Sequence, residues 1–356
     1  MGQRMNSKRA LIAGVTGAIG RALAAELASR DDWAVEGLSR RASFAPIKGV
    51  NYHQIDLDDY DKARAQLAEL SPVTHVFYCG RVTHAEQVIE DPAANLRLLA
   101  HLIEALEAGP HALQHVHLVQ GGKVYGVHLG PFPTPAAEDD PRPDIENFNF
   151  DHQDYLESRV QTAQWSWSAS RPNTLLHFSA EIGRNLVSSI GCYAMICREQ
   201  GIALDFPGAE GAWHSQTQLT TLRLLARGIA WITTEPRCAD LAFNFTNTDV
   251  IRWSDLWPRI ADFFDMPCGV VRPQCLAETM PAQGELWARI AKQHGLRFEQ
   301  MQQASNWGYL DATLERYWDE LFSHQRAFNL GFRETDDSYA RFNTLLGEYC
   351  EAGILR

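Results

Sequence analysis

The stretch Arg9-Ala10-Leu11-Ile12-Ala13-Gly14-Val15-Thr16-Gly17-Ala18-Ile19-Gly20 decides the fold of this chain. Its first apolar residues predict a buried strand, and the helix formers from 21 to 28 predict an amphipathic helix. A strand, a glycine turn and a helix in this order point free backbone N–H groups at a phosphate. The three glycines would permit the tight turn, the approach of a pyrophosphate and close helix–strand packing. A glycine turn without a ligand is the alternative, but the flanking elements favour a dinucleotide site.

Length and composition are those of an ordinary globular protein, because 356 residues can bury a large core. The net charge of −12 argues against nucleic acid or an anionic membrane as a partner. The seven cysteines include no C-x-x-C pair, and the histidines include no H-E-x-x-H motif, so we expect reduced thiols and no metal site. The short polar segment before the first strand lacks the apolar core of a signal peptide, and no run is long enough to span a bilayer. We therefore expect a cytoplasmic protein.

Strands and helices alternate along the first half of the chain. The pattern predicts strands over 33–38, 50–55, 73–79 and 113–120, helices over 59–70, 95–108 and 151–170, and a sixth strand over 173–178. This rhythm predicts an α/β protein with a Rossmann-like, doubly wound parallel sheet. We expect residues 1–180 to form most of the dinucleotide-binding domain. Residues 181–356 should form mostly a smaller, mixed substrate-binding cap, with some segments returning to the sheet.

Residues at the carboxyl ends of the predicted strands indicate which dinucleotide binds, because ligands of such sheets lie there. The second strand ends in Ser39-Arg40-Arg41, where an acidic residue is usual in NAD-specific sites. Paired guanidinium groups suit a 2′-phosphate, so we predict NADP(H). The predicted cofactor-binding residues are Gly14, Thr16, Gly17, Ala18, Ile19, Gly20, Ser39, Arg40, Arg41, Asp56, Leu57, Cys79, Gly80, Gln120, Lys123, Phe178 and Ser179.

A series of separated motifs resembles the progesterone 5β-reductase and iridoid synthase-like family, an atypical branch of the extended short-chain dehydrogenases. The motifs run nearly end to end and are the glycine turn, Ser39-Arg40-Arg41, Asp56-Leu57, Thr74 to Gly80, Gly121-Gly122-Lys123-Val124-Tyr125, Leu129 to Phe132, Arg171-Pro172, Tyr193 to Cys197, Phe243 to Asn247 and Gly331-Phe332-Arg333. The resemblance implies an NADPH-dependent reductase of activated C=C bonds in enones, often homodimeric. Its partners would be a small molecule (an enone, an aldehyde or a ketone) and a second copy of the chain.

The resemblance also implies the catalytic residues. The family pairs a lysine in a G-G-K-x-Y segment with a tyrosine in an N-F-Y-Y segment. The lysine corresponds to Lys123, whereas the second segment reads Asn147-Phe148-Asn149-Phe150-Asp151 here, with Phe150 aligned to the tyrosine. A phenylalanine lacks the hydroxyl that would stabilise the developing oxyanion. Tyr125 is a spare donor close to Lys123, and Tyr155 lies five residues beyond the aligned position, on another helix face.

Two further functions compete with a reductase of enones or carbonyls. The same fold serves nucleotide-sugar epimerases and dehydratases, although the Y-x-x-x-K motif of typical dehydrogenases is missing here. A non-catalytic NADP-binding sensor that has lost its tyrosine is the other alternative. The loop 130–143, which contains five prolines, is expected to surround the mouth of the active site.

Overall fold

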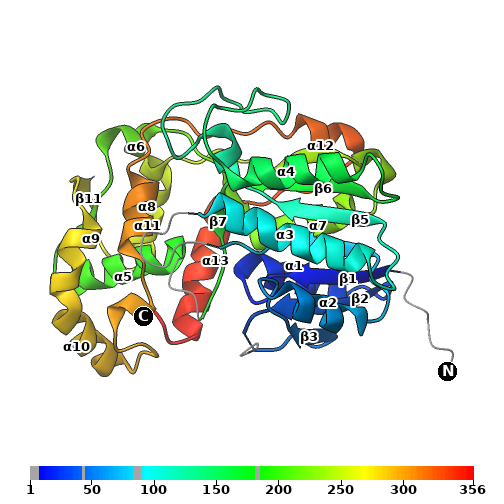
Figure 1. The fold of residues 1–356 in the computed structure, drawn as a ribbon. Helices are drawn as coiled ribbons and strands as arrows, with labels where there is room; N and C mark the ends of the chain where they lie inside the picture. Colours follow the sequence, from blue (N-terminus) through cyan, green and yellow to red (C-terminus); the bar gives the residue numbers. More distant parts are fainter. Residues whose placement is uncertain (1–7, 42–44, 83–89, 181–184) are drawn as a thin grey trace.

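The computed structural model describes residues 8–41, 45–82, 90–180 and 185–356. The predicted boundary between 180 and 181 adjoins the segment 181–184, which lies outside the described residues. Figure 1 shows two lobes, one built around a central sheet and one made mainly of helices. Within the described residues, no helix is long and apolar enough to cross a membrane.

The central sheet confirms the predicted Rossmann-like architecture. Its seven strands are all parallel and lie in the order β10-β6-β5-β4-β1-β2-β3. The strands are β1 (Lys8–Ala13), β2 (Trp33–Ser39), β3 (Val50–Gln54), β4 (His75–Tyr78), β5 (His115–Val119), β6 (Ser166–Pro172) and β10 (Leu241–Phe245). The inner strands read as short apolar runs because helices cover both faces of a parallel sheet.

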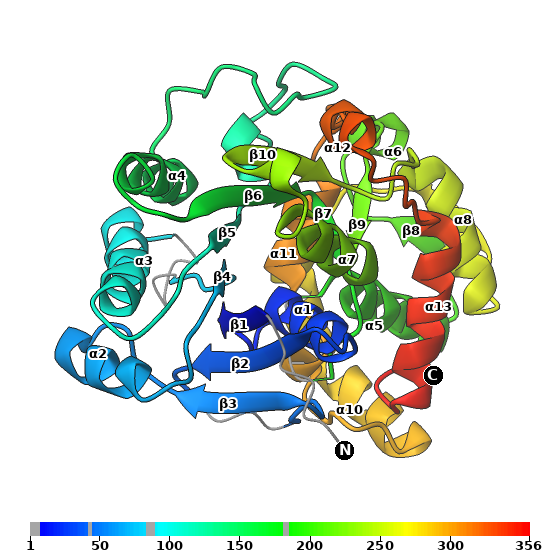
Figure 2. The same ribbon diagram turned by 90° about the vertical axis from the view of Figure 1, so that its right-hand side faces the viewer.

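Each face of the sheet has its own layer of helices, seen edge-on in Figure 2. One face packs against α2 (Tyr60–Ala68), α3 (Pro92–Glu107) and α4 (Phe148–Arg159). The other packs against α1 (Ala18–Ala28), α7 (Leu222–Ile232) and α12 (Gln325–Leu330). Because α7, β10 and α12 come from the C-terminal half, that half returns to the sheet in three places.

The second lobe has its own apolar core. It contains two small parallel sheets, one of β7 (Thr174–Leu176) and β9 (Leu219–Thr221), the other of β8 (Leu204–Phe206) and β11 (Cys268–Val271). Its helices are α5 (Leu186–Glu199), α6 (Glu210–His214), α8 (Trp253–Phe263), α9 (Leu276–Thr279), α10 (Gly284–His294), α11 (Trp307–Leu314) and α13 (Ser338–Glu351). Short 3-10 turns are η1 (Gly122–Tyr125), η2 (Pro236–Cys238), η3 (Met280–Gln283) and η4 (Met301–Gln303).

The structure corrects the predicted elements between 151 and 178. The helix ends at Arg159, and residues 166–172 form β6 instead of the end of a helix. The predicted sixth strand over 173–178 is only the three-residue β7 in the second lobe. The run Trp165-Ser166-Trp167-Ser168-Ala169-Ser170 alternates apolar side chains with serine at period two, which is the pattern of a strand. Pro172 ends that strand because proline has no N–H to donate.

Candidate active-site cleft

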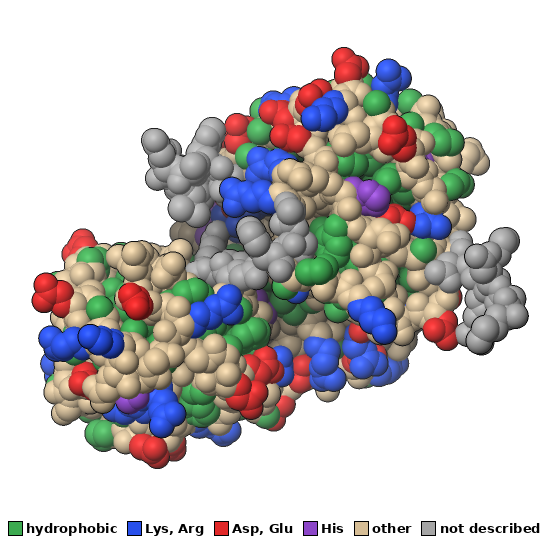
Figure 3. Space-filling model, turned by 90° about the horizontal axis from the view of Figure 1, so that it is seen from below, with side chains coloured by type: hydrophobic (Ala, Val, Ile, Leu, Met, Phe, Trp, Pro, Cys, Tyr) green, Lys and Arg blue, Asp and Glu red, His purple; other side chains and the backbone are tan. Residues whose placement is uncertain are grey.

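A cleft of about 600 Å³ follows the carboxyl ends of β1, β2, β4, β5 and β6, and Tyr309 and Arg316 from the second lobe also line it. Parallel α/β sheets bind ligands at this edge. Figure 3 shows one face of the molecule hollowed between the two lobes, with Lys and Arg side chains beside the hollow.

The glycine turn between β1 and α1 fits a pyrophosphate. Gly14 has a φ of +83°, and a Cβ there would lie 2.9 Å from the backbone nitrogen of Gly80, so both conformation and space require glycine. A Cβ on Gly20 would lie 2.3 Å from the Gly14 oxygen, which shows how closely helix and turn pack. Gly17 lines the cleft, and in the described structure no side chain caps α1 and no acidic residue occupies its first turn. The helix N-terminus is therefore open to an anion.

Thr16, Ala18 and Ile19 of the same turn also line the cleft. At the adenosine end, the cleft is lined by Ser39, Arg40, Asp56 and Leu57. The structure separates the two predicted arginines: Arg40 lines the cleft and is exposed, whereas Arg41 lies outside it. The backbone oxygen of Arg41 instead accepts a hydrogen bond from the Ser39 hydroxyl. The guanidinium available to a 2′-phosphate from within the cleft is therefore that of Arg40.

Cys79 and Gly80 after β4 and Gln120 after β5, three more of the predicted cofactor-binding residues, also line the cleft. Burial raises the pKa of the Cys79 thiol to about 12. The Gln120 side chain is held by the protein, because its Nε2 donates to the Asn149 oxygen at 3.0 Å and its Oε1 accepts from Arg171 Nε at 2.8 Å.

Phe178 and Ser179 do not line the cleft, contrary to the prediction. The ring centroids of Phe178 and Tyr349 lie 4.8 Å apart, and the Ser179 backbone N–H donates to the Tyr349 hydroxyl at 2.9 Å. The wall at this point is formed by Pro172, Asn173, Thr174 and Leu175. The error follows from the misplaced sixth strand, whose carboxyl end is Pro172 and not Phe178. The proline at 172 was the signal that marks this strand end.

Lys123, on η1 directly after β5, projects into the cleft. Its Nζ lies 2.7 and 2.9 Å from the two carboxylate oxygens of Glu90, and Arg81 Nη1 lies 3.2 Å from the same carboxylate. Burial raises the pKa of Glu90, but the ion pair with Lys123, a backbone hydrogen bond and the charge of Arg81 together outweigh it, so the pKa is lowered from its usual value.

Tyr125 and Phe150 lie away from the cleft, in a small apolar cluster with Val124, Ala136 and Phe322. The Tyr125 hydroxyl donates to Asn244 Oδ1 at 2.6 Å and accepts from Arg171 Nη1 at 3.0 Å, and burial raises its pKa to about 12. The Tyr125 hydroxyl is therefore engaged within the protein, and the Phe150 ring packs in the same cluster. Tyr155 also lies outside the cleft, against the apolar core under the sheet.

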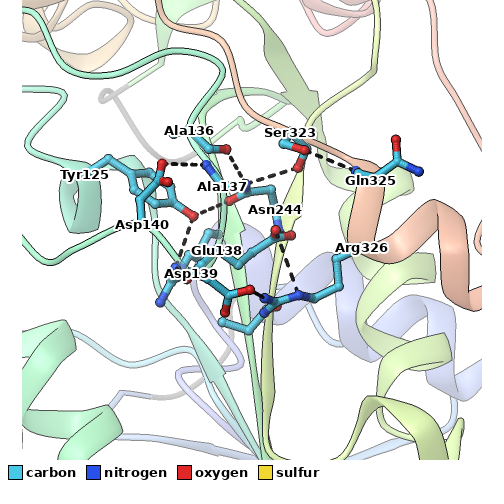
Figure 4. A network of polar contacts seen from close by, with 12 residues as sticks. Tyr125, Ala136, Ala137, Glu138, Asp139, Asp140, Asn244, Ser323, Gln325 and Arg326 are labelled. Atoms are coloured by element: carbon cyan, nitrogen blue, oxygen red, sulfur yellow. Dashed lines mark hydrogen bonds and ion pairs between the residues drawn. The ribbon is translucent and has the colours of Figure 1, made fainter.

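Figure 4 shows the polar network around Tyr125, which ties the loop 130–143 to β10 and α12. The Asn244 backbone N–H donates to Glu138 at 2.8 Å, and its side chain donates to the oxygens of Ala136 and Ser323. Arg326 pairs with Asp139. No residue of this described loop lines the cleft, so its expected place around the mouth stays a prediction.

The first turn of α4 presents Asn149 to the cleft. This residue is not among the site residues predicted from the sequence. It lines the cleft together with Phe148 and is 4% exposed. Its Nδ2 donates to Asn147 Oδ1 at 2.9 Å, and Asn147 caps the helix. Gln153, one turn further, accepts from Gln120. The asparagine cap at 147 was the available signal, because it makes residues 148 and 149 the first helical positions.

The parallel sheet, the open glycine turn and the cleft bounded by a second lobe define an extended short-chain dehydrogenase/reductase. A family model described as a PRISE-like Rossmann-fold domain matches residues 32–320. The chain belongs to this family, as the sequence motifs indicated.

Known proteins agree with this assignment. The chain is 32% identical over 350 residues to an (S)-8-oxocitronellyl enol synthase of Nepeta racemosa, covering 93% of this chain and 89% of that protein. It is 31% identical over 350 residues to a 3-oxo-Δ4,5-steroid 5β-reductase of Arabidopsis thaliana, with the same coverages. A solved short-chain dehydrogenase/reductase superfamily protein of Agrobacterium tumefaciens with bound NAD has the same fold, with a TM-score of 0.65 and 16% identity, over 97% of this chain and 96% of that chain. These relatives confirm the predicted class of enzyme.

Proposed function

We propose that this protein is an NADPH-dependent reductase of activated C=C bonds. The observation that carries the proposal is the continuous cleft that joins the open N-terminus of α1 to Lys123. When bound, NADPH supplies a hydride to the β-carbon of an enone and leaves as NADP⁺, and a proton from water completes the saturated ketone. The groups described below bind, orient and stabilise charge along that cleft.

The cofactor is held at three points. The free N–H groups at the start of α1 bind the pyrophosphate, and Arg40 pairs with the 2′-phosphate. The backbone of Cys79 and Gly80, which follow β4, would lie beside the adenosine ribose. The assignment of NADPH rather than NADH rests on Arg40.

The substrate carbonyl lies near Lys123, whose ammonium stabilises the negative charge that develops on oxygen. Two of its three donors are engaged by Glu90, which leaves the third for the substrate or the nicotinamide ribose. Asn149 supplies a neutral amide donor on the same wall. An amide is a weaker acid than a tyrosine hydroxyl, so strongly activated alkenes and aldehydes should be the better substrates.

The test is NADPH consumption against a panel of enones, enals, ketones and nucleotide sugars, with product analysis. Formation of saturated ketones at one NADPH per product supports the proposal. Turnover of nucleotide sugars without net consumption of cofactor supports the epimerase instead, and tight NADPH binding without turnover of any compound supports a sensor. The homodimer implied by the family resemblance and the cytoplasmic location expected from the sequence are part of the same proposal, to be tested by sedimentation and by cell fractionation.

A further inference from the structure

A second cation lines the cleft on the side of the second lobe. Arg316 follows α11, and its side chain is 19% exposed. Its Nε donates to the Ala312 oxygen at 3.1 Å, and its Nη1 donates to Glu320 Oε1 at 2.8 Å. Among the described residues, Nη2 makes no hydrogen bond. The guanidinium is therefore fixed in direction and retains free donors.

The carboxylate that fixes Arg316 lies behind it and not in the cleft. Glu320 is buried and does not line the cleft, and it also accepts from Thr217 Oγ1 at 3.0 Å and from Asn173 Nδ2 at 3.4 Å. Several donors thus share its charge. Glu320 orients Arg316 without blocking the guanidinium face that is turned to the cleft.

The charge balance at this end of the cleft is positive. Apart from Asp56 at the adenosine end, the only carboxylate that lines the cleft within the described residues is Glu90, and Lys123 and Arg81 already pair with it. The pKa of the exposed His128 is lowered, first by partial burial and then by the positive charges of Lys123 and Arg316, which act against the negative charge of Glu90. The field around Arg316 therefore favours an anion.

From these contacts we infer that Arg316 binds a carboxylate on the substrate, so that the preferred substrates are enones that carry an acid group. The inference rests on the proposed reductase function. Arginine matches a carboxylate with two parallel hydrogen bonds, and the third donor of Lys123, which Glu90 does not engage, remains for the carbonyl. The apolar wall of Val127, Phe148 and Leu175 contacts the carbon skeleton between the two polar ends.

The experiment compares 3-benzoylacrylic acid with its methyl ester at saturating NADPH. The ester is the more electrophilic alkene, so a higher kcat/KM for the acid has to come from recognition. We expect the unmodified protein to prefer the acid at least tenfold. Arg316→Gln should lower kcat/KM for the acid by roughly ten- to a hundredfold, because a charged hydrogen bond contributes that much. The same substitution should change kcat/KM for the ester less than twofold.

Two further variants separate recognition from folding. Arg316→Lys keeps a charge beside Glu320 and should retain part of the preference. Arg289→Gln, an exposed position on α10 outside the cleft, should behave like the unmodified protein. Equal kcat/KM for acid and ester, or a loss confined to the affinity for NADPH in Arg316→Gln, would overturn the inference.

A binding measurement keeps the inference apart from the proposed function. The NADP⁺-loaded protein is titrated by calorimetry with the same acid and ester. Tighter binding of the acid, lost in Arg316→Gln, supports the carboxylate site even if neither compound is reduced. Equal binding of the two compounds contradicts the site, whether or not the protein reduces enones.

Discussion

Lys123 and Glu90 form an ion pair in the cleft, with the Lys123 Nζ 2.7 and 2.9 Å from the two carboxylate oxygens of Glu90. Glu90 immediately precedes α3, whereas Lys123 follows β5, so two neighbouring β–α connections are linked across the sheet edge. The pair fixes the ammonium before any substrate arrives, which is what electrostatic stabilisation requires.

Removing the Lys123 ammonium should slow the reaction. We expect Lys123→Ala to lower kcat by about a hundredfold on every enone. Glu90→Gln keeps the shape but loses the charge, and should lower kcat about three- to tenfold with the KM for NADPH within twofold. Lys292→Ala, exposed on α10, is the control. A rise in the KM for NADPH with kcat unchanged in Lys123→Ala would instead assign the lysine to the cofactor ribose alone.

Cofactor preference should depend on one arginine and not on two. Arg40 lines the cleft and Arg41 does not. Loss of a charged hydrogen bond costs about 1.5–3 kcal/mol, so Arg40→Ala should weaken NADPH binding roughly ten- to a hundredfold and leave NADH binding unchanged. Arg41→Ala should change neither. Calorimetric titration of both cofactors measures this, and equal affinities for NADH and NADPH in the unmodified protein would contradict the assignment.

The missing hydroxyl should be restored at position 149 and not at position 150. Asn149 faces the cleft, whereas the Phe150 ring packs beside Arg142 and within the Tyr125 cluster. Asn149→Tyr should raise kcat on simple enones at least tenfold, since one oxyanion donor typically contributes 10²–10³ in turnover. Phe150→Tyr should leave kcat unchanged. If Phe150→Tyr alone accelerates the reaction, the face of α4 that meets the substrate is misassigned.

Acid should destabilise the fold, because two buried histidines stay neutral within a chain of hydrogen bonds. The chain runs through Ser166, His115, Ser168, His117 and Ser170 in that order. Burial lowers the pKa of His115 to about 3 and that of His117 well below its usual 6.5. The unfolded chain therefore binds more protons below pH 6.5, and each histidine removes about 1.4 kcal/mol of stability per pH unit.

Urea denaturation at pH 7, 6 and 5 measures this loss. His115→Gln should reduce the dependence of the unfolding free energy on pH between 6 and 5, by about 1.4 kcal/mol per unit. His214→Gln, exposed on α6, should leave it unchanged. A constant free energy of unfolding from pH 7 to 5 in the unmodified protein would show that these histidines are already protonated in the fold.

The sequence by itself determined the first five strands of the sheet and the glycine turn that begins the cleft. The glycine turn and the strand ends at 39, 54 and 78 are local patterns. Each strand, turn and helix start is encoded by adjacent residues, and a parallel sheet brings the strand ends to one edge. The motifs also identified the family and placed Lys123 directly after β5.

Only the tertiary structure decided which side chains face the cleft at the substrate end. Asn149 and Phe150 are neighbours in sequence, but about 100° of helical rotation separates them, so one lines the cleft and the other joins a separate cluster. Arg316 is distant in sequence from every strand end and reaches the cleft only because the second lobe packs against the sheet. Local patterns do not encode such long-range packing.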